Sequence, residues 1–104
     1  MFHVIRASAK EHRAMSRVVS ITLQNTDAAR PIIDAITADN PGLVINPMPG
    51  IVKIDREGSL IIRRESVESR IGRTWDPQEL HLCIVSMAGN VDEDDDYFAL
   101  AWAH

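Results

Sequence analysis

With 104 residues, of which 45% are hydrophobic and 25% charged, the chain can form one domain with one core, and disorder over most of its length is excluded. Its formal net charge of −4 argues against nucleic acid as a partner, because phosphate backbones attract clustered Lys and Arg. The chain has one cysteine and no apolar run near the roughly 20 residues that span a bilayer, so we expect a cytoplasmic protein without a membrane partner.

The first 16 residues differ from the rest of the chain. Apolar residues are sparse after Ile5, and Glu11 is the only acid. We interpret residues 1–16 as an N-terminal extension, either a mobile tail or an arm that orders on a partner, and a short helix is a third option. Residues 17–104 are predicted to form a single domain.

A strand followed by a helix is predicted at the start of this domain. Apolar and polar residues alternate over residues 17–24, which is typical of a strand. Thr26 or Asp27 can cap a helix in which apolar residues recur at helical spacing between residues 29 and 36. The breakers at residues 39–42 end this helix.

Three short strands are predicted in the middle of the chain. They cover residues 43–46, 51–55 and 59–63. The prolines at residues 46–50 predict a loop after the first of them. Gly58 supplies a positive φ between the other two, which predicts a tight hairpin.

A second helix is predicted over residues 64–72, with Ser66 as its cap and Gly72 as its stop. Trp75 is expected to pack beneath the turn that follows. Residues 80–87 contain few polar groups, which favours a central strand covered on both faces. The chain then turns at Gly89-Asn90, and a last strand is predicted over residues 97–102.

These elements predict an α/β (α+β) domain in the order β-α-β-β-β-α-β-β. We expect a mostly antiparallel sheet of about six strands with two short helices. The loop after residue 85 has two interpretations: a contact surface delivered by a rigid strand, or the ordinary turn of a core strand.

The sequence contains no recognisable catalytic or cofactor motif. No pair of its four histidines has metal-ligand spacing, and the acidic run at residues 92–96 fails the EF-hand pattern. That run is interpreted as a solvated loop that protects a sheet edge, or as a steering patch for a basic partner. Cys83 has no neighbouring base and is expected to be buried and inert. We therefore expect no catalytic residue, no metal and no cofactor.

An ordered set of short motifs resembles a known family. The set comprises Leu23-Gln24-Asn25, Ala38-Asp39-Asn40-Pro41, Val52-Lys53-Ile54, Ile71-Gly72-Arg73, Gln78-Glu79-Leu80, and the runs at residues 60–65, 86–90, 92–96 and 102–104. It is similar to the small regulatory or coupling (effector) proteins of bacterial multicomponent diiron monooxygenases. The C-terminal runs look closest to the phenol hydroxylase branch.

The resemblance implies a cofactor-free protein that docks on the hydroxylase component, near the cavity of its diiron centre, and promotes hydroxylation of an aromatic substrate. The iron ligands would belong to that partner, and a reductase component would compete or cooperate with the docked protein. Two other functions remain open at this point: a small-molecule-binding sensor module and, ranked last, an enzyme.

The expected partner surface combines the resemblance with loop position. Its residues sit at predicted strand and helix ends and offer amide groups, an adaptable side chain or close backbone approach. They are Asn25, Asn40, Ser86, Met87, Gly89 and Asn90.

Overall fold

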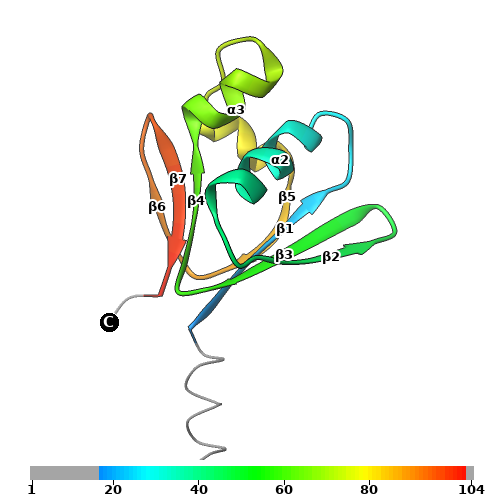
Figure 1. Cartoon of the computed structure of the whole chain (residues 1–104), viewed down its shortest axis with the longest axis vertical. Helices are drawn as coiled ribbons and strands as arrows, with labels where there is room; N and C mark the ends of the chain where they lie inside the picture. Colours follow the sequence, from blue (N-terminus) through cyan, green and yellow to red (C-terminus); the bar gives the residue numbers. More distant parts are fainter. Residues whose placement is uncertain (1–16, 103–104) are drawn as a thin grey trace, which may run out of the picture.

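Two antiparallel sheets, with helix α2 in the opening between them, make up the fold of residues 17–102, the part described by a computed structural model (Figure 1). The elements are β1 (Val18–Gln24), α2 (Arg30–Asp39), β2 (Val44–Met48), β3 (Ile51–Glu57), β4 (Ser59–Arg63), α3 (Arg64–Ile71), the 3-10 helix η1 (Pro77–Leu82), β5 (Ile84–Ala88), β6 (Asn90–Glu93) and β7 (Tyr97–Ala101). The α+β class and the element order are confirmed, with seven strands in two sheets. The predicted extension at residues 1–16 lies outside the described residues.

The four-stranded sheet has the order β2-β3-β1-β5, so β1 lies at its centre and β5 at one edge. Every second residue of β1 is fully buried against the core: Val19, Ile21 and Leu23. The prediction of a central strand over residues 80–87 was wrong. Residues up to Leu82 belong to η1, because Asp76 and Glu79 form a capping box that starts a helical turn.

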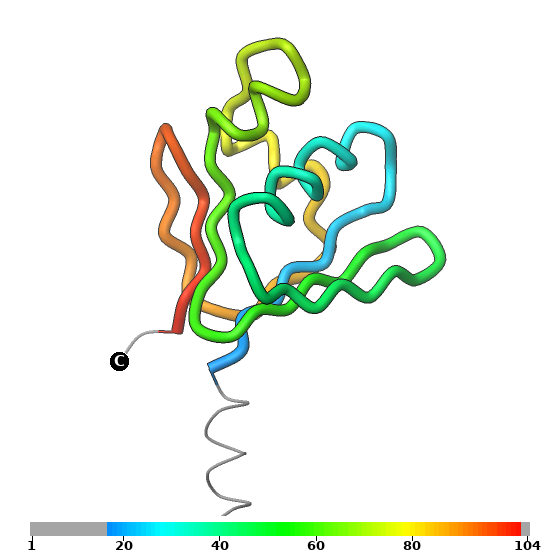
Figure 2. Tube along the Cα trace, in the orientation of Figure 1, coloured from blue at the N-terminus to red at the C-terminus, as the bar shows by residue number. Residues whose placement is uncertain are grey.

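The predicted hairpin across Gly58 was also wrong. β3 pairs with β1 on one side and with β2 on the other, so it has no free edge for the next strand. β4 pairs instead with β7 in the three-stranded sheet, which has the order β4-β7-β6. Gly58, with φ +91°, stands between β3 and β4. The tube in Figure 2 shows the chain passing from one sheet to the other between these two strands.

Two segments predicted as loops contain strands. β2 continues through Pro47 to Met48, which an edge strand tolerates because one side of its main chain needs no partner. The acidic run begins in β6, the edge strand beside β7. Edge strands of this kind are hard to predict because they are short and lack a buried face.

The core lies between α2 and the inner faces of the sheets. α2 contributes Ile32, Ile33 and Ile36, while β7 contributes Phe98 and Leu100. The predicted burial of Trp75 is confirmed, with 2% of its surface exposed.

The ends of α3 correspond only partly to the prediction. Gly72 ends α3 in the left-handed conformation at φ +72°, as predicted, but Arg63 and not Ser66 occupies the N-cap position. At the end of β7, Trp102 Nε1 donates to Val18 O at 2.8 Å and joins the last strand to the first. Among residues 17–102, no helix is long and apolar enough to cross a membrane.

Candidate docking surface

A row of exposed apolar side chains follows β5 and its two flanking segments. The row consists of Leu82, Val85, Met87 and Val91, which are between 38% and 79% exposed. Ser86 is exposed beside them and pairs with Thr22 of β1. These residues follow one another closely along the chain, and a segment that exposes several large apolar side chains is a candidate contact surface.

Gly89 carries the chain from β5 into β6 and approaches its own fold closely. A Cβ at this position would lie 3.1 Å from Val19 Cγ1 and 3.6 Å from Leu100 Cβ, and φ is +134°. The close approach expected at Gly89 therefore occurs within the domain, to β1 and β7. Asn90 follows as an exposed residue that pairs with Ala101.

Asn25 directly follows β1, near the Leu82 end of this row, because Gln24 N donates to Cys83 O. Its Oδ1 accepts from Arg30 Nη2 at 3.1 Å, and its main-chain N–H donates to Gly50 O. Thr22 pairs with Ser86, so Asn25 lies about 10 Å further along the strand. The six predicted partner residues thus do not form one cluster.

Asn40 is buried, with 2% of its surface exposed. Its Nδ2 donates to Ile61 O at 2.7 Å, and its Oδ1 accepts from Ile61 N at 2.8 Å. The Nδ2 also donates to Ile36 O at the end of α2. The carboxamide therefore imitates a neighbouring strand for β4 and joins β4 to α2, which differs from the exposed role expected for it.

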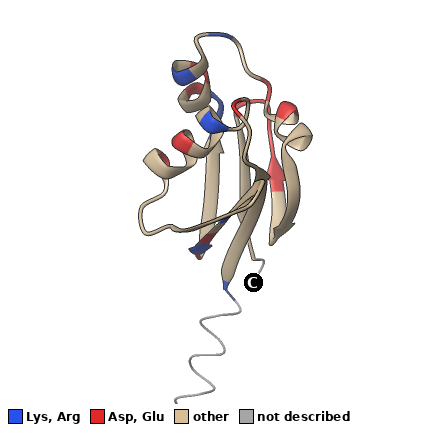
Figure 3. Cartoon of the chain, turned by 90° about the vertical axis from the view of Figure 1, so that its right-hand side faces the viewer, with Lys and Arg blue, Asp and Glu red and all other residues tan. Residues whose placement is uncertain are grey.

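Charged residues lie along the helices and around the β6–β7 turn (Figure 3), and β3 carries Lys53, Asp55, Arg56 and Glu57. On the turn side, Tyr97 OH donates to Asp92 Oδ2 at 3.0 Å, and this bond raises the pKa of Tyr97. His81 Nε2 lies 3.2 Å from Glu93 Oε1. Within residues 17–102, no three His, Cys, Asp or Glu side chains come close enough together to hold a metal ion.

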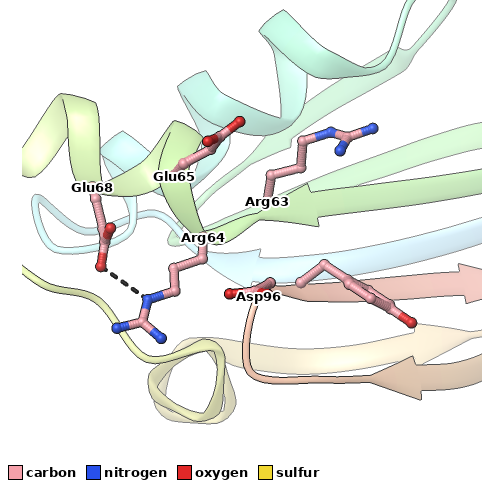
Figure 4. A pocket seen from close by; sticks show the side chains of 6 residues that line it. Arg63, Arg64, Glu65, Glu68 and Asp96 are labelled. Carbon is pink, nitrogen blue, oxygen red and sulfur yellow. Dashed lines mark hydrogen bonds and ion pairs between the residues drawn. The ribbon is translucent and has the colours of Figure 1, made fainter.

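A charged hollow of about 530 Å³ lies where α3 meets β7 and the acidic turn (Figure 4). Glu68 Oε2 accepts from Arg64 Nε at 3.0 Å and from Trp75 N at 2.8 Å. The Trp75 N–H, followed by the Arg64 guanidinium, holds the pKa of Glu68 below its usual value. Because Glu68 is engaged by both donors, its carboxylate joins α3 to the next loop.

An apolar hollow of about 370 Å³ opens between α2, α3 and η1. Ile32, Val67 and Trp75 form buried walls, and Leu82 stands at the rim with 79% of its surface exposed. Cys83 lies at the base, where burial raises the pKa of its thiol, as expected for an inert cysteine.

The sequence-based reasoning missed the apolar residues on either side of β5. Leu82 was placed inside a covered strand, and Val85 and Val91 were not considered as contacts. The capping box formed by Asp76 and Glu79 was the available signal, because a D-x-x-E pattern marks the start of a helical turn. With this signal, the strand is predicted to begin at residue 84, after a helical turn that contains Leu82.

Comparison with known proteins gives a consistent result. Residues 17–101 match the model of the MmoB/DmpM family. The chain is 47% identical over 88 residues to the phenol 2-monooxygenase stimulatory component DmpM of Pseudomonas sp. (strain CF600), covering 85% of this chain and 98% of that protein.

Solved structures share the fold. A chain of a phenol hydroxylase–regulatory protein complex superposes with a TM-score of 0.80 at 42% identity, covering 83% of this chain and 99% of that one. The soluble methane monooxygenase regulatory protein B superposes with a TM-score of 0.67 at 17% identity, covering 83% of this chain and 65% of that one. The latter likeness concerns the fold alone.

Proposed function

Because the chain belongs to the MmoB/DmpM family, we propose that it is the regulatory component of a multicomponent phenol-type monooxygenase, a non-catalytic protein that binds the hydroxylase and promotes substrate hydroxylation. One observation carries the proposal. The chain matches 99% of the length of a chain in a phenol hydroxylase–regulatory protein complex, at 42% identity and a TM-score of 0.80.

The proposed mechanism is differential binding. A protein without catalytic groups changes the rate of its partner only if it binds one conformation of that partner more tightly than another. The diiron centre resides in the hydroxylase, and this chain docks near the cavity that leads to it. Preferential binding to the productive conformation raises the population that reacts with substrate.

The proposed contact surface is centred on β5. Ser86, Met87 and Asn90 are exposed there, and Met87 is flexible enough to adapt to an irregular partner. Asn25 extends the surface along β1. Gly89 and Asn40 support it from within, since one allows β5 to cross into β6 and the other ties α2 to β4.

A reconstituted assay tests the function. Purified hydroxylase and reductase are mixed with phenol and titrated with this protein, and product formation is measured. We expect the rate to rise and saturate near one regulatory chain per binding site on the hydroxylase. A rate unchanged over the whole titration, together with no binding to the hydroxylase, would refute the proposal.

The reductase is titrated in the same assay to separate competition from cooperation. A cytoplasmic location is also part of the proposal, and the buried free thiol of Cys83 fits a reducing compartment.

A further inference from the structure

The two sheets have four edge strands: β2 and β5 in one, β4 and β6 in the other. An edge strand presents main-chain N–H and C=O groups that can pair with a further strand, and proteins usually block such pairing. The way each edge is blocked can therefore be compared within one molecule.

A proline blocks the β2 edge. Asn25 N donates to Gly50 O, so the odd-numbered residues of β1 direct their main chain toward β3. The even-numbered residues of β3 therefore direct their main chain toward β1, and the odd-numbered ones toward β2. Pro47 is opposite Val52, an even-numbered residue, so the main chain of Pro47 faces away from β3, toward the open edge. Pro47 has no N–H to offer there, so a further strand would lack that hydrogen bond.

Side chains block both edges of the three-stranded sheet. On β4, the carboxamide of Asn40 occupies both the N–H and the C=O of Ile61. On β6, Asp92 and Glu93 place two negative charges within a strand of four residues. Charge on an edge disfavours the approach of another strand.

The β5 edge has none of these features. Its five residues, Ile84–Ala88, include no charge and no proline. A register shift opposite Thr22 and Leu23 marks a bulge, but it lies at the Ile84 end and leaves the rest of the strand regular.

The main chain of Met87 points to this open edge. Gln24 N donates to Cys83 O at 2.9 Å, so the even-numbered residues of β1 direct their main chain toward β5. In this register, Ser86 and Ala88 are hydrogen-bonded to β1. The N–H and C=O of Met87, which lies between them, face outward, and no segment of residues 17–102 pairs with them.

We propose that β5 accepts an extended segment of the hydroxylase, which pairs with the main chain of Met87 and adds a fifth strand to the four-stranded sheet. This inference rests on the proposed function, which provides the partner. The groups on offer are a main-chain donor and acceptor on a regular strand, and extended peptide is the ligand that satisfies them. Val85, two residues before Met87 and 53% exposed, offers an apolar contact to a side chain of that segment.

Hydrogen exchange of single amides provides the first test. In the free full-length protein we expect the Met87 amide to exchange fast, and the Ser86 and Ala88 amides to exchange slowly because β1 protects them. On addition of hydroxylase, the Met87 amide should slow by at least tenfold. An unchanged Met87 rate in a complex that still forms would overturn the proposal.

A pair of variants separates the main chain from the side chain. Met87→Pro removes the outward N–H and leaves the bonds of Ser86 and Ala88 to β1 intact, in the manner of Pro47 at the opposite edge. Met87→Ala removes the side chain alone. We expect the proline variant to bind hydroxylase about tenfold more weakly than the alanine variant, the effect of one lost main-chain hydrogen bond. Equal affinities for the two variants would refute strand addition.

Other occupants give different results. Slow exchange at Met87 in the free protein that grows with protein concentration would assign the edge to a second copy of the chain. Slow exchange that disappears on deletion of residues 1–14 would assign it to the chain's own N-terminal segment. Each result overturns the proposal. Stimulation of phenol hydroxylation by the wild-type protein is read separately, so failure of strand addition is distinguishable from failure of the proposed function.

Discussion

Replacing Asn40 by alanine tests whether this residue acts inside the domain or at its surface. The substitution removes both bonds to Ile61, leaving one N–H and one C=O without a partner. Ile36 O keeps the main-chain N–H of residue 40 as its donor, so the end of α2 loses little. The lost hydrogen bonds are therefore those at the outer edge of β4.

The expected loss follows from these two groups. A buried main-chain group without a partner costs about 1 to 3 kcal/mol, and the half-buried position of Ile61 favours the lower end. We expect Asn40→Ala to lower the free energy of unfolding by about 2 to 3 kcal/mol. For a domain of this size that corresponds to a fall in Tm of roughly 10 to 20 °C.

Asn25→Ala is the matched control, since Asn25 is exposed and its side chain bonds only to Arg30. It should change the free energy of unfolding by less than about 0.5 kcal/mol. Urea unfolding followed by circular dichroism measures both variants, and hydroxylase binding is measured per folded molecule. An Asn40→Ala protein with a wild-type unfolding curve and greatly weakened binding would refute the reasoning and make Asn40 a direct contact.

Met87→Asp should weaken hydroxylase binding, measured by titration, by about 2 kcal/mol with little change in Tm. Met48 lies on the opposite edge strand and is 41% exposed, against 38% for Met87, so Met48→Asp is the control and should bind normally. Gly89→Ala should lose about 2 kcal/mol or more of stability in urea unfolding from its positive φ and tight contact, and Gly50→Ala only about 1, since nothing lies near its Cβ. The depressed pKa of Glu68 stabilises the fold above the unfolded value of 4.5, and this stability is lost as pH falls through the folded pKa. Glu68→Gln should therefore make the free energy of unfolding depend less on pH below pH 4.5. The same pH dependence for the variant and the wild type in this range would contradict the prediction.

The elements with a buried face could be predicted from sequence. β1 and α2 showed clear alternation and a helical stripe because one side of each packs on the core. β6 and the Pro47–Met48 end of β2 could not, because edge strands bury little and their residues carry no periodic pattern. The partition into two sheets was equally hidden, since it depends on which strand edges are free after β3 has paired on both sides.

The candidate surface was predicted in part. Met87 and Asn90 are exposed on one segment because a chain that leaves a strand carries its polar and flexible residues to the surface. The role of Asn40 depends on a partner 21 residues later in the chain, Ile61. No local pattern reports such a contact, so an asparagine beside a proline was interpreted as an ordinary helix end.

The position of β7 determines when the domain can form during synthesis. β7 is the last strand within residues 17–102, yet it lies in the middle of its sheet, with β4 on one side and β6 on the other. Both neighbours therefore emerge from the ribosome before the strand that joins them exists. Strand pairs in the other sheet are also distant in sequence, since β1 pairs with β5. The three-stranded sheet therefore cannot form until β7 has been synthesised, and its pairing follows that of the earlier local elements.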